Sequence, residues 1–183
     1  MADQENQVQE QAAPPKPTMC PCCGHDGSQI VRPSPSDQQE YIRCLLAGRP
    51  FRKVYQLYNG QLKLAFETAS ATQSEQLSGL LMEIRQQRFG DGEVTQLQDA
   101  QFTGLVLALR MLCSLRSVNG KELTPLSLNS SAELMDAYKE RLGGKDEGLL
   151  TLMIQVHLGF TKLCSLLMAS GRDDSFWKGA GYV

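Results

Sequence analysis

The feature that most constrains the fold is a pair of alternating segments, residues 53–58 and 61–66, joined by Asn59-Gly60. Asn-Gly favours a type I′ turn, whose twist matches that of paired antiparallel strands. A two-residue turn sets a register in which facing residues match in character. The predicted pairs are Leu57 with Leu62, Tyr55 with Leu64, and Gln56 with Lys63. Because a lone hairpin is marginally stable in water, its apolar face must pack on helices or on another protein's sheet.

Apolar residues at helical spacing predict five helices around this hairpin. The predicted ranges are about 36–47, 72–88, 95–118, 130–142 and 147–170, with a short extended piece at 121–128. The fold class is therefore α+β and mainly α-helical, a helical bundle with one β-hairpin at residues 53–66.

Cap signals place the helix starts. Ser36 with Gln39, and Thr72 with Glu75, each match the capping-box pattern. Asn129 or Ser130 begins the fourth helix. Gly48 suits the left-handed position that ends the first helix. The predicted apolar side of that first helix consists of Tyr41, Ile42, Leu45 and Leu46.

The domain organisation follows from composition. Residues 1–19 form a polar, proline-containing extended arm, 20–31 a cysteine-rich turn, 32–170 the helical body and 171–183 an extended, glycine-rich C-terminal tail. The tail holds the single tryptophan, Trp177, together with Phe176 and Tyr182. Aromatic side chains on such a tail need a docking surface, so we predict that they bind a partner. Tyr55 and Tyr58 of the hairpin are predicted to do the same.

The cysteine-rich turn reads Cys20-Pro21-Cys22-Cys23-Gly24-His25, which resembles half of a zinc knuckle. Structural zinc takes four ligands, and Cys20 and Cys23 supply two of them. Cys22 competes with Cys20, His25 offers a third ligand, and Cys44 or a second subunit could close the site. We predict one structural zinc here. The alternatives are a surface turn with reduced thiols or a disulfide between chains.

The sequence gives little support for an enzymatic function. The sequence contains neither a phosphate-binding glycine-rich loop nor a Gly-x-Ser-x-Gly motif. His157 lies in an apolar helix and is predicted to be a hydrogen-bonded core residue. Cys113 and Cys164 are predicted to be small core residues. We expect a non-enzymatic protein.

Nucleic acid and membrane are not expected partners. Arg43, Arg49, Arg52 and Lys53 cluster at the entry to the hairpin, but the chain has 18 basic and 20 acidic residues and a net charge of −2. Residues 149–169 are apolar but include Lys162, and they are read as a buried core helix rather than a membrane span. Residues 1–17 are polar and do not form a secretory signal.

The order of parts also resembles a known class of proteins. After the polar arm and the knuckle come a short helix behind Arg32-Pro33-Ser34-Pro35-Ser36, then Gly48-Arg49-Pro50-Phe51, the hairpin, and Phe66-Glu67-Thr68-Ala69 leading into a helix. From Arg32 to about Ile84 this order is similar to that of small virion or tail-assembly proteins of tailed bacteriophages. The resemblance lies in the order of parts and implies no catalytic residue.

These observations give three functional hypotheses. The first is a structural or assembly protein of a phage tail or baseplate, held in a larger assembly by its arms and hairpin. Its partners would be other subunits or further copies of itself, and it would be located in the virion tail or the host cytoplasm. The second is a zinc-knuckle regulatory protein that binds nucleic acid. The third is a tail-assembly chaperone absent from the mature particle.

Overall fold

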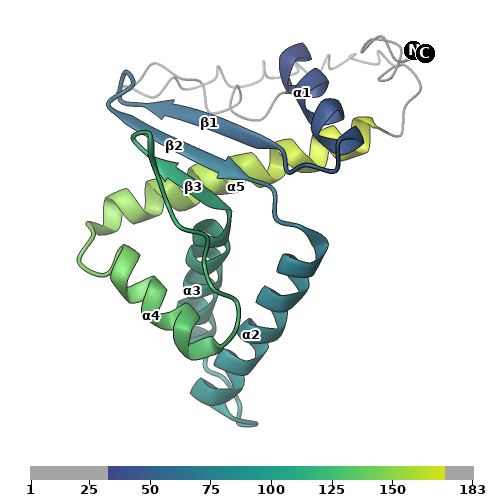
Figure 1. The fold of residues 1–183 in the computed structure, drawn as a ribbon. Coiled ribbons are helices and arrows are strands. Elements are labelled where there is room, and N and C mark those ends of the chain that lie inside the picture. The colour runs from purple at the N-terminus through teal and green to yellow at the C-terminus, as the bar shows by residue number, and fades with distance from the viewer. Residues whose placement is uncertain (1–32, 172–183) are drawn as a thin grey trace, which may run out of the picture.

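The computed structural model describes residues 33–171, so residues 1–32 and 172–183 lie outside its description (Figure 1). The described part has five helices and four strands, which follow one another as α1 (Pro35–Leu46), β1 (Arg52–Leu57), β2 (Leu62–Glu67), α2 (Ala71–Phe89), α3 (Gln96–Ser114), β3 (Leu115–Val118), β4 (Lys121–Glu122), α4 (Ser131–Leu142) and α5 (Glu147–Ser170). The protein is thus mostly helical with a small antiparallel sheet, as the coarse prediction stated.

The hairpin register is confirmed. β1 pairs with β2 through all three predicted partner pairs, from Leu57 opposite Leu62 outward. The turn uses positive φ angles at Tyr58 (50°), Asn59 (54°) and Gly60 (85°). Asn and Gly tolerate this left-handed region, which explains why this dipeptide sets the turn. The extra left-handed residue, Tyr58, was not anticipated.

The predicted third helix, 95–118, is wrong at its end. α3 stops at Ser114, and Leu115–Val118 form β3, which pairs with β2 opposite the hairpin partner. β4 then pairs with β3, so the sheet has the order β1-β2-β3-β4. The edge of β2 that does not face β1 offers backbone hydrogen bonds to another strand. These bonds outweigh the helical periodicity of residues 115–118. The prediction of a single hairpin is therefore wrong as well.

The N-caps of two helices lie two residues earlier than predicted. The caps are Ser34, whose box closes on Asp37, and Ser70, whose box closes on Gln73. Pro35 suits the first helical position because it lacks an N–H that would otherwise be unpaired there. Asp37 also pairs with Lys53 of β1, which ties the start of α1 to the sheet. Of the two caps predicted for the fourth helix, Asn129 and Ser130, the structure uses Ser130.

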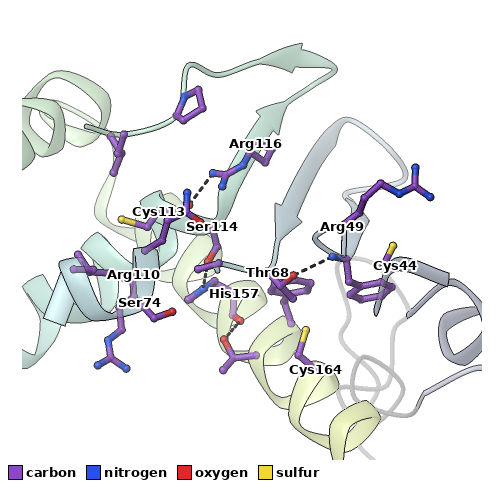
Figure 2. Close-up of a pocket in the computed structure, with 18 of the residues that line it drawn as sticks. Cys44, Arg49, Thr68, Ser74, Arg110, Cys113, Ser114, Arg116, His157 and Cys164 are labelled. Atoms are coloured by element: carbon purple, nitrogen blue, oxygen red, sulfur yellow. Dashed lines mark hydrogen bonds between the residues drawn. The ribbon is translucent and has the colours of Figure 1, made fainter. Parts of the chain in front are cut away.

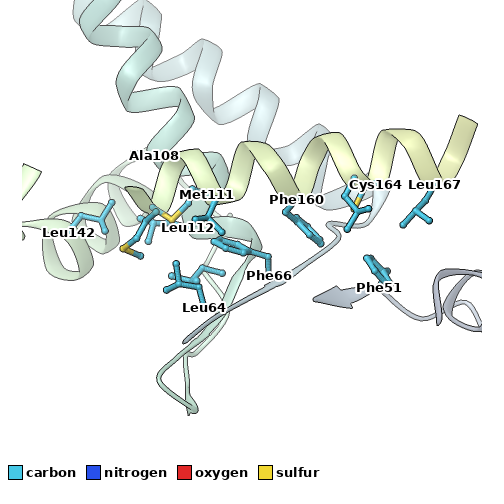
Figure 3. Packing of buried hydrophobic residues seen from close by; sticks show 14 of the residues in the cluster. Phe51, Leu64, Phe66, Ala108, Met111, Leu112, Leu142, Phe160, Cys164 and Leu167 are labelled. Atoms are coloured by element: carbon cyan, nitrogen blue, oxygen red, sulfur yellow. The ribbon is translucent and has the colours of Figure 1, made fainter. Parts of the chain in front are cut away.

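The main core lies between the sheet and α5, which crosses the sheet face (Figures 1 and 3). Phe66 of β2 packs on Phe160 of α5 with ring centroids 5.9 Å apart, and Phe51 stacks on Phe160 at 6.2 Å. Tyr41 of α1 meets Phe51 edge to face at 5.6 Å. Aromatic pairs in these arrangements add to the stabilisation that burial itself provides.

The predicted apolar side of α1 is only half right. Ile42 is fully buried and Cys44 nearly so, whereas Leu45 and Leu46 are 56% and 62% exposed. α1 contacts the body through one narrow stripe, because it lies at the end of the sheet rather than across its face (Figure 1).

A second cluster forms between α2, α3 and α4. Its buried members are Leu77, Leu81, Ile84, Leu105, Leu109 and Leu134. Among the described helices, α5 alone is long and apolar enough to cross a membrane by length and composition. In this structure its buried stripe, from Met153 to Leu167, belongs to the core.

Candidate functional site

A groove of about 500 Å³ opens where α1, α2, α3 and α5 approach one another (Figure 2). Its floor is apolar, with Phe51 and Phe160 from the main core and Leu77 from the second cluster. Its rim includes Leu45 of α1 and Met168 of α5, which are 56% and 55% exposed. The volume falls in the range of ordinary ligand-binding clefts.

The charged residues that line the groove are all basic. Its lining includes Arg49, Arg110 and Arg116 and contains neither Asp nor Glu, although the whole chain carries a net charge of −2. Arg116 is already paired, because its Nε lies 3.0 Å from Glu67 Oε1 and its Nη1 donates to the Cys113 carbonyl at 2.7 Å. Arg49 and Arg110 have no carboxylate partner within residues 33–171. The groove therefore suits a guest with an apolar body and a negative charge.

His157 is a buried core residue, as predicted. Its Nε2 lies 3.2 Å from the Ser114 hydroxyl, and its Nδ1 has no partner in the described part of the chain. Burial, with a smaller contribution from Arg110, lowers the pKa of His157 to about 4. The ring is therefore neutral at physiological pH. No carboxylate hydrogen-bonds to it among the described residues, so it lacks the orienting partner that a catalytic base usually has.

The three described thiols are poor nucleophiles. Burial raises the pKa of Cys113 to about 11 and that of Cys164 to about 12. Burial also raises the pKa of Cys44, and nearby Glu40, whose Oε1 lies 3.7 Å from the sulfur, adds to this effect. Because the thiolate is the reactive form, all three side chains remain protonated, inert thiols at neutral pH.

The predicted zinc ligands are not brought together by anything the structure describes. Cys20, Cys22, Cys23 and His25 lie outside the described residues. Cys44 is the one predicted ligand inside them, and it sits on the buried stripe of α1. Within residues 33–171, no group of three His, Cys, Asp or Glu side chains could hold a metal ion. Zinc binding stays a prediction.

The two hairpin tyrosines differ in availability. Tyr55 packs against Phe66 with centroids 6.1 Å apart, its hydroxyl is buried without a described partner, and burial raises its pKa. Tyr58 lies in the turn and is 44% exposed. Of these two predicted contact residues, Tyr58 is the one free to meet a partner. The other three, Phe176, Trp177 and Tyr182, lie outside the described residues.

The sheet also has an open edge. β1 is its first strand, and no described strand pairs with its outer side. The Thr68 N–H donates to the Phe51 carbonyl at 2.9 Å, so Phe51 bonds inward. Antiparallel strands alternate, which makes residues 53, 55 and 57 bond inward and turns the backbone of residues 52, 54 and 56 outward. Val54 is 52% exposed, and its backbone N–H and C=O point away from β2, toward the open edge.

Most basic residues at the hairpin entry already have acidic partners. Arg43 pairs with Glu40 at 3.7 Å and Arg52 with Glu122 at 2.5 Å. Lys53 pairs with Asp37, and hydrogen bonds from Lys53 and Ser34 lower the pKa of Asp37 although burial opposes this. These pairs weaken the electrostatic case for a nucleic-acid surface.

Sequence reasoning missed the groove. Its lining residues come from segments up to about 127 residues apart, from Tyr41 to Met168, so no local sequence pattern could predict the groove. One signal was present: Arg110 interrupts an otherwise apolar run from Leu105 to Cys113. An exposed charge in such a run marks a position where a buried helix meets solvent.

Comparison with known proteins identifies no relative. No protein-family model matches the chain, and neither a curated protein nor a solved structure shows significant similarity to it.

Proposed function

We propose that this chain is a non-enzymatic structural or assembly protein that holds a neighbouring subunit at the open edge of its sheet. The observation that carries the proposal is β1, a six-residue edge strand whose outer side has no described strand partner. An extended segment of a neighbour can add to such an edge through backbone hydrogen bonds, with exposed side chains such as Val54 and Tyr58 selecting it.

Two further observations support this assignment. Within the described residues, the histidine and the thiols lack the partners that catalysis needs. Val54, on β1 itself, and Leu46, at the end of α1, are apolar residues that are 52% and 62% exposed. The narrower assignment to a phage tail or baseplate rests on the resemblance in the order of parts from Arg32 to Ile84.

Site-specific crosslinking tests the edge. Val54 is replaced by p-benzoylphenylalanine in the full chain, which is then expressed in its native cells. We expect irradiation to join position 54 to one defined segment, belonging to a second copy or to another subunit. The same probe at exposed Glu93, beyond the far end of α2, is the matched control. Equal crosslinking at both positions would overturn the proposal.

Proline provides the second arm of this test. Val54→Pro removes an N–H group that points away from β2, so no hydrogen bond between β1 and β2 is lost. Val54→Thr keeps this N–H, and threonine, like valine, favours a β-strand. We expect the proline variant to remain folded and lose the neighbour, and the threonine variant to keep it.

A chaperone would show the same contact but be absent from finished particles. Binding to single-stranded DNA that falls steeply with salt would favour the nucleic-acid alternative.

A structural zinc remains part of the proposal. Native mass spectrometry of the reduced chain should show one zinc, and Cys20→Ser and Cys23→Ser should each release it. Cys44→Ser tests whether Cys44 is the residue that closes the site, since only then does this variant lose zinc in the monomer. Unchanged metal content in Cys20→Ser and Cys23→Ser would rule out the site.

A further inference from the structure

We infer that the groove between α1, α2, α3 and α5 is the docking site for the chain's own C-terminal tail, residues 172–183, with Phe176 and Trp177 seated on its apolar floor. The inference does not depend on the proposed function, because the groove and the β1 edge are separate surfaces. Three observations carry it: where the tail begins, how far it reaches, and what the groove lacks.

The tail begins beside the groove. One stripe of α5 lines the groove along its length, namely His157, Phe160, Thr161, Cys164 and Met168. Met168 is at the rim, and α5 ends two residues later at Ser170, with Gly171 as its cap. A chain that reverses direction after Gly171 therefore runs back over this stripe.

The reach of the tail matches the groove. From the helix end at Ser170 back to Phe160 is 10 residues of helix, or about 15 Å at 1.5 Å per residue. The six residues from Arg172 to Trp177 span up to about 20 Å when extended. Phe176 and Trp177 can therefore lie over Phe160 and Leu77, whereas a much shorter tail would leave the inner end of the groove empty.

The groove and the tail complement each other chemically. The lining has no carboxylate and two arginines, Arg49 and Arg110, without an acidic partner in the described residues. The tail supplies Asp173 and Asp174 directly after the helix end, followed by two adjacent aromatic residues. Docking would pair the carboxylates with the arginines and cover the exposed apolar rim formed by Leu45 and Met168.

Fluorescence of the full chain tests the inference, because Trp177 is its single tryptophan. A peptide of residues 172–183 serves as the undocked reference. We expect the full chain to emit at shorter wavelength than the peptide and to be quenched several-fold less by acrylamide. Emission and quenching equal to those of the peptide would overturn the inference.

Variants locate the site. Leu45→Glu, Met168→Glu and Arg110→Glu change exposed groove residues without touching the core, so the fold should persist. Each should raise quenching toward the peptide value. Leu97→Glu is the matched control, since Leu97 is 69% exposed and lies about 20 Å along α3 from Arg110. Circular dichroism confirms folding of each variant, and protection that survives all three groove changes would overturn the site.

Concentration separates the two possible sources of a docked tail. If the tail is held by its own chain, the protection of Trp177 from acrylamide should not depend on protein concentration between low and high micromolar. Protection that appears only as concentration rises would mean that the tail of a second copy occupies the groove, and the intramolecular inference would be wrong.

Discussion

The core under the sheet and the cluster between α2, α3 and α4 bury side chains in different ways. The first joins segments far apart in sequence, with Phe51, Phe66 and Phe160 stacked together (Figure 3). The second joins α2, α3 and α4 through leucine and isoleucine side chains. In the described part of the chain the first contains 15 buried residues and the second six, so the sheet core supplies most of the apolar burial.

The difference explains where the groove forms. Its floor takes Phe51 and Phe160 from the sheet core and Leu77 from the helical cluster, so it lies along the seam between them. Leu126 and Tyr138 contact both clusters and hold the two sides together. A hollow forms where the two clusters meet, because the side chains pack closely within each cluster but less closely across the boundary between them.

The largest effect is expected in the sheet core. Phe66 is fully buried and contacts Tyr55, His157 and Phe160. Phe66→Ala should lower the free energy of unfolding by about 3–5 kcal/mol, because it removes a large apolar side chain and leaves a cavity. Urea unfolding followed by circular dichroism measures this loss. A loss no larger than that of the matched change in the helical cluster would contradict the ranking of the two regions.

That matched change is Leu109→Ala, at a fully buried position of α3. We expect it to cost about 2–4 kcal/mol. Unfolding should remain a single transition, because Leu126 and Tyr138 couple the clusters. Hydrogen exchange provides the sharper readout: early, separate exchange of α2 with the sheet still protected would show that the clusters unfold independently.

The smallest effect depends on pH. His157 has a folded-state pKa of about 4 against an ordinary value of 6.5, so between these values the unfolded chain binds a proton that the folded chain does not. Stability should therefore fall by roughly 2–3 kcal/mol as pH drops from about 6.5 to 4, and the contribution of this group should level off about one pH unit lower. His157→Gln keeps a hydrogen-bonding group near Ser114 and removes the titration. A fall of equal size in both proteins would assign the pH dependence to other groups.

Local patterns predicted those elements whose signals lie within a few residues. The hairpin register followed from Asn59-Gly60 and alternation, and α5 followed from one long apolar stripe. The cap of α1 was misplaced because Ser36 with Gln39 matches the capping-box pattern, whereas the box that forms joins Ser34 to Asp37, which also pairs with Lys53 of another element. Leu45 and Leu46 were predicted to be buried because their spacing is helical, but within residues 33–171 they are 56% and 62% exposed.

The sequence by itself determined that the chain is mainly helical, that residues 53–66 form a hairpin, and that His157 lies in a buried helix face. Each of these depends on side-chain periodicity or turn chemistry, which act over short stretches of chain. Only the tertiary structure decided that residues 115–118 leave the helix to extend the sheet, that β1 is the edge among the described strands, and that Arg110 lies beside a groove whose described lining has no acid. These features depend on contacts between distant segments, whose backbone bonds and packing outweigh local preference.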